Sequence, residues 1–487
     1  MLGFQGLQRK KKAEVALFQG AMNESEIAQE EAMQFAGSEK RRWMQLGQRY
    51  YAGQHDILQR PRTAIGERGE TVAVRNMADN RICHAFLRDL VDQKCQYLLG
   101  RPFSVTAGGG MAEQRLNEWM DAEFSALLLR WARDALVAGI GWLYVYYDEK
   151  GTMRFRRMRP EEIAPIWADE EHRTLDAVLR CYEREEYQGR QRRIVECVSL
   201  WDAEGVRHYR RESGRLRPDK TFGAASEPHF RDVVGGKIRR GGFGTVPFIP
   251  LKYNDEEQPL LQSIKTMIDA YDRIVSDNSN ALEDQPNSIL VLRNYDGQNL
   301  GEFRRNLAAY RAVKVSDDGG VDILPTAIDH TAASAQLDRL RRDIYAFGRG
   351  IDHRADRIGA AASGVALRHE YAALDLDCNG LEWQCKVALQ KVCEFLFVDW
   401  EARAENAFER AAVEFTFSRD IITNEESAID MAKKSSGMLS QRTILANHPW
   451  VRDVNDEIRQ MEQNQRGEGT GEEAAIEEEK QGENDGE

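Results

Sequence analysis

Apolar residues recur three or four positions apart over much of the stretch from residue 255 to residue 410, and this spacing predicts helices. The first series starts directly after Pro259, which suits the first turn of a helix, and ends near Asp284. The third series runs from Leu367 to Leu396 with a period near 3.5 residues, and predicts a helix of about 40 residues, roughly 60 Å long. The first series comprises Leu260, Ile264, Met267, Tyr271, Ile274, Asn278 and Leu282. The second comprises Leu337, Leu340, Ile344, Phe347 and Ile351, with Asp338, Arg339, Arg342 and Arg349 on the opposite face.

Two interruptions separate these helices. Between the first and second helix lies a small insert, and between the second and third lies Gly348–Gly364, a glycine- and alanine-rich stretch that is typical of a loop. The elements predicted in the insert are a strand at Ile289–Arg293, a turn at Asn294–Gln298, a short helix at Leu300–Arg311, and a hairpin of Ala312–Val315 and Val321–Leu324 around Asp317–Gly320.

Residues 1–250 combine both patterns and predict an α+β domain. Helices are predicted at Glu24–Gln54, at Asn80–Leu99, which ends before Gly100 and Pro102, and at Ala112–Ile140. Short runs rich in β-branched and aromatic residues then alternate with turn signals and predict an antiparallel meander. These runs are Trp142–Tyr147, Met153–Met158, Leu175–Arg184, Arg193–Trp201 and Val206–Arg211, followed by a loop-like Arg215–Gly244.

The C-terminal region returns briefly to strand and then to helix. Val413–Phe417 predicts a strand, and Glu425–Ser436 and Val451–Gln463 predict two helices. The final segment, Gly467–Glu487, holds nine acidic residues, one lysine and few apolar ones, which predicts disorder.

Charge narrows the choice of function. The whole chain carries −13, but −8 of this lies in the acidic tail, so the other 466 residues carry only −5. Such a body is not a basic nucleic-acid binder, because tight binding to duplex DNA needs many phosphate contacts from Lys and Arg. With 42% hydrophobic residues and a length of 487, the chain has enough material for several packed domains.

Candidate chemistry is scarce. The seven cysteines form no C-x-x-C pair, which favours reduced thiols, and Cys378, Cys385 and Cys393 share one helical stripe as small apolar residues. The sequence contains no phosphate-binding loop, no H-E-x-x-H zinc motif and no nucleophile elbow. Asp375 and Asp377 lie on different faces of the third helix, which is poor geometry for a shared metal. We therefore expect no enzyme activity, no cofactor and no metal, and the N-terminus shows no secretion signal.

Several strings in fixed order give a sharper indication. They are RYYAGQHDIL (49–58), DQKCQYLLGRPFS (92–104), VPFIPLKYNDEE (246–257), IDAYDRIVSDNSN (268–280), DIYAFGRGID (343–352), ASGVALRH (362–369) and QRTILANHPWV (441–451). In these strings the chain, from about residue 40 to residue 465, resembles the portal proteins of tailed siphophages that infect Gram-positive bacteria.

The resemblance implies a portal fold with its usual domains. They are an N-terminal polar segment (1–40), a wing (41–254), a stem helix (255–284), a small α/β clip (285–328), a second stem helix (329–352), a tunnel loop (353–366), a long helix with a return to the wing (367–422), crown helices (423–465) and the acidic tail (466–487).

The resemblance also implies a function. Portal proteins form rings, of twelve copies in the virion, at a single capsid vertex after assembly in the host cytoplasm. The ring conducts double-stranded DNA without sequence specificity during packaging and ejection. Its expected partners are the large terminase subunit, the scaffold and major capsid proteins and the head-completion or adaptor proteins that join head to tail; no membrane is expected.

Two sets of residues become candidates through this resemblance. The expected DNA-channel residues, in and beside the tunnel loop, are Arg349, His353, Arg354, Arg357 and Ser363. The expected partner-docking residues, at the tip of the clip, are Asn294, Tyr295, Asp296 and Gly297. Twelve copies of a loop arginine would place a ring of positive charge around DNA, whereas pairing of these arginines with Asp352 and Asp356 is the alternative.

Two other classes of protein remain as alternatives. A nucleic-acid-processing enzyme, such as a nuclease or packaging ATPase, would need the phosphate loop or carboxylate cluster that the sequence lacks. Another oligomeric phage structural protein, such as a coiled-coil scaffold, would account for the long near-heptad helix but not for the strand-rich region.

Overall fold

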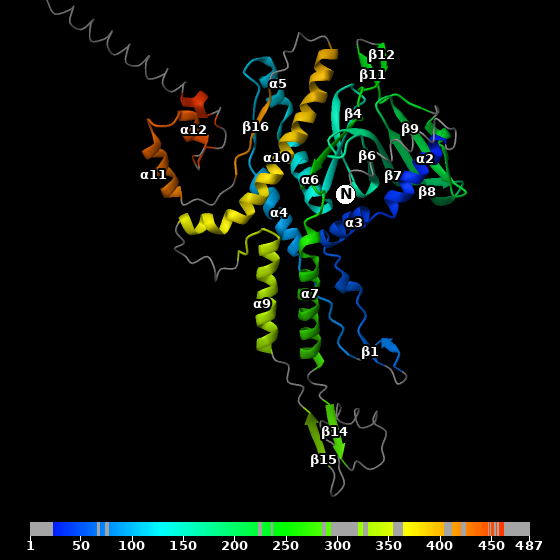
Figure 1. The fold of residues 1–487 in the computed structure, drawn as a ribbon, viewed down its shortest axis with the longest axis vertical. Coiled ribbons are helices and arrows are strands. Elements are labelled where there is room, and N and C mark those ends of the chain that lie inside the picture. Colours follow the sequence, from blue (N-terminus) through cyan, green and yellow to red (C-terminus); the bar gives the residue numbers. More distant parts are fainter. Residues whose placement is uncertain are drawn as a thin grey trace, which may run out of the picture. The chain divides into compact units, whose positions relative to one another are not determined.

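The computed structural model describes residues 23–65, 69–73, 77–222, 226–234, 237–284, 289–293, 320–324, 330–353, 364–403, 412–419 and 425–446, with 448, 450, 451, 454 and 457–461. The chain divides into two compact units. Unit 1 draws on Met1–Gln48, Leu87–Gln262 and Arg349–Glu487, and unit 2 on Arg49–Phe86 and Ser263–Gly348. The predicted mixture of helix and sheet is confirmed (Figure 1).

Unit 1 contains the predicted antiparallel meander. It is a five-stranded sheet in the order β10-β9-β8-β7-β6, whose strands are Arg215–Pro218, Val206–Glu212, Gln191–Trp201, Leu175–Gln188 and Ile163–Trp167. The first two predicted strands belong instead to a separate three-stranded sheet in the order β13-β4-β5, made of Phe248–Lys252, Ile140–Tyr147 and Met153–Met158.

The prediction of a loop at Arg215–Gly244 is wrong. This stretch holds β10 and the hairpin of β11 (Phe230–Val234) and β12 (Lys237–Gly241). Ser213 has a φ of 49° and Gly214 a φ of 81°, and a two-residue hairpin turn requires such positive values. This turn connects β9 to β10, which pair with each other. Because β10 is a short edge strand with one buried residue, Leu216, it lacks the apolar alternation by which strands are recognised.

The core between the two sheets is rich in tryptophan. Trp142, Trp167 and Trp201 lie in one buried cluster with Met44 and Phe248. Met44 comes from α3 (Glu39–Tyr51), which follows α2 (Glu24–Ala36). These are two helices rather than the one predicted, because the Ser38 hydroxyl accepts a hydrogen bond from the Arg41 amide at 3.1 Å and starts a new helix after Gly37.

The helices that follow are also split or shortened relative to the prediction. Asp121 caps a new helix by accepting from the Phe124 amide at 2.9 Å, so Ala112–Ile140 is α5 (Met111–Trp119) and α6 (Ala122–Ala138). The helix predicted from Asn80 is α4 (Phe86–Leu99), and residues 80–85 are extended. Short 3-10 turns occur at Asp56–Gln59, Pro160–Glu162 and Lys220–Phe222.

The predicted long helix is confirmed. It is α10, Gly364–Ala402, with 39 residues. Its buried stripe contains Leu374, Cys378, Leu381, Cys385, Ala388, Val392 and Leu396, all among the predicted positions. The three cysteines of α10 are buried free thiols, as expected.

The C-terminal part of unit 1 is largely as predicted. β16 (Glu414–Thr416) pairs antiparallel with β3 (Ser104–Thr106). It is followed by α11 (Glu425–Ser435) and by α12 (Gln441–Ala446), which the sequence pattern did not predict. Of the last predicted helix, Val451–Gln463, residues 451, 454 and 457–461 are described; 454 and 457–461 are helical, whereas Val451 is not.

Unit 2 contains most of the first two predicted long helices. α7 (Leu261–Asp284) begins in unit 1 and ends at the predicted residue, and α9 is His330–Phe347. β14 (Ile289–Arg293) pairs with β15 (Gly320–Leu324), so the strand at Ile289 is confirmed and the second strand is paired with it. The elements predicted for 294–319 lie outside the described residues, and so do Asn294, Tyr295, Asp296 and Gly297. A second ribbon pairs β1 (Thr63–Ile65) with β2 (Thr71–Ala73).

The buried faces of the two long helices differ from those predicted. Leu282 is 51% exposed and Phe347 is 64% exposed, although both had been assigned to an apolar face. The buried face of α7 instead ends in polar residues: Asp272, Ser276 and Asn280. No helix among the described residues is both long and apolar enough to span a membrane.

Candidate functional site

The first candidate site is the chain between α9 and α10. Of the five expected channel residues, Arg349 and His353 are described, and both are exposed. Arg354, Arg357 and Ser363 lie outside the described residues. We refer to Arg349, Gly350 and Ile351 as the loop root, because they lead directly into the stretch expected to form the loop.

The backbone of the loop root is unusual at Arg349. Its φ is +50°, in the left-handed region that side chains disfavour, at a cost of roughly 1–2 kcal/mol. The Arg349 carbonyl accepts a hydrogen bond from the Lys94 ammonium at 2.9 Å. Lys94 is 0% exposed, and this contact is one of the two that accommodate its charge.

The second contact of Lys94 is an ion pair. Its Nζ lies 2.7 Å from Oδ2 of Asp377 on α10, and the Tyr253 hydroxyl donates to the same oxygen at 2.7 Å. Burial, together with the charge of Asp377, raises the pKa of Tyr253 well above its usual range, so this hydroxyl stays a proton donor. Asp377 therefore has two partners in the interior, Lys94 and Tyr253, in addition to Arg349.

The guanidinium of Arg349 makes a weaker contact with the same carboxylate. Nη1 lies 3.2 Å from Oδ1 of Asp377, and the Arg349 side chain is 60% exposed. Exposed pairs of this kind contribute about 0–1 kcal/mol, so the guanidinium can exchange Asp377 for another anion at little cost. Asp377 is a partner of Arg349 that sequence reasoning did not identify.

One face of α4 fixes the rest of the loop root. The Gln93 amide donates to the Ile351 carbonyl and accepts from the Ile351 N–H, both at 2.9 Å. A side chain at Gly350 would place its Cβ 2.1 Å from Leu90 Cδ2, so any other residue there would have to displace the buried Leu90 side chain. Ile351 then packs with Tyr97, and Leu374 and Cys378 of α10 join the same buried cluster. The two helices thus hold the start of the loop and the body of the helix after it against each other.

A second site lies in unit 2, where the extended residues 78–84 run along α7. We call this segment the strap. Alternate backbone amides of the strap donate to side chains four residues apart on α7. The pairs are Ala78 to Asp284 at 3.1 Å, Asn80 to Asn280 at 2.6 Å, Ile82 to Ser276 at 3.0 Å and His84 to Asp272 at 2.9 Å.

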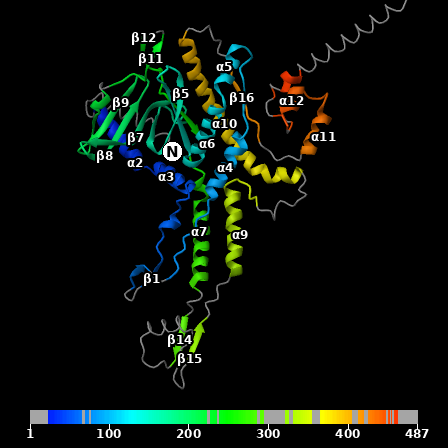
Figure 2. The ribbon, with the colours of Figure 1, turned by 180° about the vertical axis from the view of Figure 1, so that it is seen from behind.

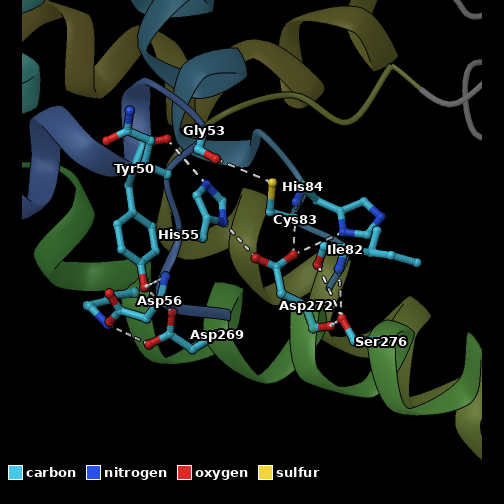
Figure 3. Close-up of polar contacts among 12 residues, drawn as sticks. Tyr50, Gly53, His55, Asp56, Ile82, Cys83, His84, Asp269, Asp272 and Ser276 are labelled. Atoms are coloured by element: carbon cyan, nitrogen blue, oxygen red, sulfur yellow. Dashed lines mark hydrogen bonds and ion pairs between the residues drawn. The ribbon is translucent and has the colours of Figure 1, made fainter. Parts of the chain in front are cut away.

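The lengths of the two elements explain this pairing. Two extended residues advance about 6.6 Å, and four helical residues advance about 6 Å. A strand lying along a helix can therefore meet a side chain every turn. Buried amides need acceptors, and the small polar residues of α7 supply them where apolar residues would leave them unpaired. We call each of these four hydrogen bonds a rung, and Figure 3 shows the rungs at Asp272 and Ser276.

Asp272 also binds two imidazoles. Its Oδ2 lies 2.6 Å from Nδ1 of His55, and its Oδ1 lies 3.0 Å from Nδ1 of His84 (Figure 3). His55 is 1% exposed, and its other nitrogen lies 3.3 Å from the Tyr50 carbonyl. Both nitrogens of His55 thus lie within hydrogen-bond distance of an oxygen.

This arrangement shows no sign of catalysis. The neighbouring thiol of Cys83 lies 3.4 Å from the Gly53 carbonyl, and burial raises its pKa, the opposite of what a nucleophilic cysteine needs. Asp272 is 0% exposed and is occupied by its own chain. Among the described residues, no cluster of ligands suited to a metal ion is found.

A third buried carboxylate lies in unit 1 at Glu257, just before α7. Its Oε1 lies 2.8 Å from His172 Nδ1 and 3.3 Å from Lys252 Nζ, and its Oε2 pairs with Lys40. Burial alone would raise the pKa of Glu257, but the hydrogen bond from His172 and the charge of Lys40 outweigh it and lower the pKa to about 2. Glu257 has a φ of +55°, and its carbonyl lies where a Cβ on Gly139 would fall, so the approach to α7 is tightly fixed.

Sequence reasoning missed Lys94, Gln93, Asp272 and Glu257 as individual residues. Each lies in one of the strings that carry the portal resemblance. The available signal was the spacing of Asp272, Ser276 and Asn280, which are polar residues one turn apart on what would otherwise be the apolar face of a helix.

Comparison with known proteins completes the assignment. The family model described as "Phage portal protein, SPP1 Gp6-like" matches residues 36–470. The portal protein of Bacillus phage SPP1 is 30% identical over 421 residues, which are 86% of this chain and 82% of that protein. The portal protein of Clostridium phage phiCD119 is 28% identical over 428 residues, which are 84% of this chain and 89% of that protein.

Two solved structures resemble the chain more distantly. A chain from "Neck of native GTA particle computed with C12 symmetry" has a TM-score of 0.36 and 14% identity, and covers 75% of this chain and 90% of its own. A chain from "Neck of empty GTA particle computed with C6 symmetry" has a TM-score of 0.38 and 12% identity, with the same coverage. Neither contributes to the assignment, which follows from the sequences.

The chain is an α+β protein whose described sites hold backbone segments in place. It belongs to the phage portal protein family of the SPP1 Gp6-like type, a structural family, and its function is that of a portal protein. The resemblance inferred from the sequence is confirmed.

Proposed function

We propose that this chain assembles into a ring of twelve copies at one capsid vertex, and that double-stranded DNA passes through the ring during packaging and ejection. Membership in the portal family, over residues 36–470, carries this proposal. The ring docks the large terminase subunit, nucleates the capsid with scaffold and major capsid proteins, and later binds adaptor proteins that join head to tail.

The domains of the portal fold are part of the proposal. Residues 41–254 form the wing, 255–284 and 329–352 the stem helices, 285–328 the clip, 353–366 the tunnel loop, 367–422 the long helix and its return, and 423–465 the crown. The docking residues Asn294, Tyr295, Asp296 and Gly297 form the tip of the clip. The positions of α7, α9 and α10 along the chain support these divisions.

Charge supports a conduit in which DNA slides. A duplex held by many phosphate contacts is bound tightly, whereas the chain outside its acidic tail carries only −5 over 466 residues. The contacts between the ring and DNA are then few and lie at fixed positions in and beside the tunnel loop. They are supplied by Arg349, His353, Arg354, Arg357 and Ser363. Arg349 suits this role because Asp377 keeps Lys94 and Tyr253 as partners when the guanidinium moves to a phosphate.

Electron microscopy of the purified full-length protein tests the ring. Negatively stained particles should be rings with a central hole, and symmetry averaging should give their copy number. Compact monomers or rods at every protein concentration would refute the proposal.

A substitution series tests the channel residues. Capsids assembled with Arg349→Ala, or with Arg354→Ala and Arg357→Ala together, should package or retain less DNA than wild type, and salt should affect the variants less. Arg173→Ala is the matched control, because Arg173 is also exposed, at 78%, and also pairs with one carboxylate. DNA retention equal to wild type in all the loop variants would rule out this role.

The enzyme and scaffold alternatives have direct tests. Purified protein should show no ATPase or nuclease activity beyond that of a mock preparation. A scaffold leaves the mature capsid, so finding the protein at one vertex of finished virions by immunogold labelling would exclude that alternative.

A further inference from the structure

The outer face of α10 carries large exposed apolar side chains, and among the described residues the Lys386 ammonium contacts this face, 5.2 Å from the centroid of the Trp383 ring. Leu376, Trp383, Val387 and Val398 are 69%, 69%, 51% and 42% exposed. Each lies two residues after a member of the buried stripe, and two residues turn a helix by about 200°, so these four side chains lie opposite the core. We call them, with Gly380, the outer stripe.

Gly380 gives an independent indication. It lies between Leu376 and Trp383 at helical spacing, in the interior of a long helix, where glycine is a poor helix former. A Cβ added there would meet no atom within 4 Å, so the packing of this chain does not call for glycine. A glycine between two large exposed side chains leaves a notch that another chain can approach closely.

A helix that is apolar on two opposite faces is typical of one packed between two layers. The core of unit 1 provides one layer for α10. Large exposed apolar side chains aligned on one face mark an interaction site rather than an ordinary surface, particularly when a tryptophan lies among them.

A matching surface lies on the same unit, at the tip of the hairpin formed by β7 and β8. Tyr187 is 75% exposed and Ile194 is 63% exposed, and the register places them on the same face of the sheet. Arg192 lies on the same face and pairs with Glu185, and Arg190 is exposed in the turn beside them. Glu394 is exposed on the same face of α10, near Val398, and its charge complements that of Arg190.

The placement of the two surfaces suits a ring. In Figures 1 and 2, β4 and β6 lie between the hairpin of β7 and β8 and the helix α10, so the two surfaces are well separated within unit 1. A closed ring needs two different patches on each subunit, each facing a different neighbour. We propose that the outer stripe of α10 receives the tip of the β7–β8 hairpin of a second copy of this chain, with Gly380 and Trp383 at the centre of the contact.

This proposal rests on the proposed ring, and cross-linking separates the two. Trp383→Cys and Ile194→Cys variants of the full-length chain are prepared separately, mixed, assembled and treated with a short bismaleimide. A cross-linked dimer should form in the mixture and should be at least tenfold weaker in either variant alone or in wild type, whose own cysteines are the background. Rings that form normally while the mixture gives no dimer above background overturn the proposal and leave the ring intact.

A second variant guards against simple misfolding. Gly380→Leu should lower the fraction of protein in rings at least tenfold, because the notch is filled, while the Tm of the monomer stays the same or rises, because leucine is the better helix former. Met111→Ser is the control, since Met111 is 55% exposed but lies on α5, outside the stripe. Wild-type yields of rings from Gly380→Leu would also overturn the proposal, whereas a wild type that never forms rings refutes the ring itself.

Discussion

The loop root in unit 1 and the strap in unit 2 are both irregular backbone segments, and their polar groups are satisfied in two different ways. In both, an irregular segment of backbone lies against a helix whose side chains satisfy its polar groups. The strap uses one small polar side chain per turn of α7, four in all. The loop root uses a buried ammonium, Lys94, on a strained residue, with an ion pair behind it. The hydrogen bonds of the strap fix the register of a long contact, whereas the contact of Lys94 fixes a single turn at the loop root.

The two segments are therefore sensitive to substitution in different ways. The strap spreads its stability over several neutral hydrogen bonds, each worth about 1 kcal/mol net. The loop root depends on one buried charge, whose loss leaves the Asp377 carboxylate with the exposed Arg349 guanidinium as its cationic partner. Substitutions should therefore act gradually on the strap and abruptly on the loop root.

The largest effect is expected from Lys94→Met. It removes the donor to the Arg349 carbonyl and leaves Asp377 buried without its ammonium, which should cost about 3–5 kcal/mol of unfolding free energy. Urea titration followed by circular dichroism would measure this. The double variant Lys94→Met with Asp377→Asn should recover part of the loss, and a double variant as unstable as the sum of both single ones would show that the ion pair is not the cause.

Acid should act next most strongly, through Glu257. Its pKa is about 2 in the folded chain and 4.5 as an ordinary carboxyl group, a difference worth about 3 kcal/mol. Because the folded pKa is the lower one, this stability is complete above pH 4.5 and is lost as the pH falls toward 2. The free energies of unfolding of wild type and Glu257→Gln should therefore differ most near pH 6 and converge near pH 2. A constant difference over this range would contradict the assignment.

The strap should respond in graded steps. Asp272→Ala removes the partner of His55 Nδ1 and the acceptor of the His84 amide and should cost about 3 kcal/mol, and Ser276→Ala, which loses one hydroxyl, about 1 kcal/mol. Hydrogen exchange of the amides at 78, 80, 82 and 84 gives a local measurement. Each variant should speed exchange mainly at its own rung, and uniform acceleration along the strap would show that the rungs do not act separately.

The smallest effect is expected at Arg349 itself. Glycine tolerates a φ of +50°, so Arg349→Gly should be more stable than Arg349→Ala by about 1 kcal/mol. Thermal unfolding of the two variants measures the difference. Equal stability would mean that the backbone relaxes at this residue, and the account of a strained loop root would fail.

Regular repeats could be predicted from the sequence because they depend on neighbours in the chain. The stripe of α10 and the strands of the meander follow from periods of about 3.6 and 2 residues. The end of α7 at Asp284 was also predicted.

The rest depends on partners distant in sequence. Lys94 is surrounded by polar residues in the sequence and has the pattern of a solvated charge, yet its partners are 255 and 283 residues away. Asn278 and Leu282 continued the apolar spacing of α7, but the strap, some 200 residues earlier, selected the adjacent face with Ser276 and Asn280. A pattern confined to one helix cannot show which backbone groups it will have to satisfy.

The strap and α7 have repeats of slightly different length, about 6.6 Å for two extended residues and about 6 Å for four helical residues. Over three intervals the difference adds up to about 2 Å, yet the four hydrogen bonds remain between 2.6 and 3.1 Å long. Each acceptor is on a side chain, whose rotation takes up the difference in repeat length, so the backbone of α7 keeps its regular geometry while it follows the strap.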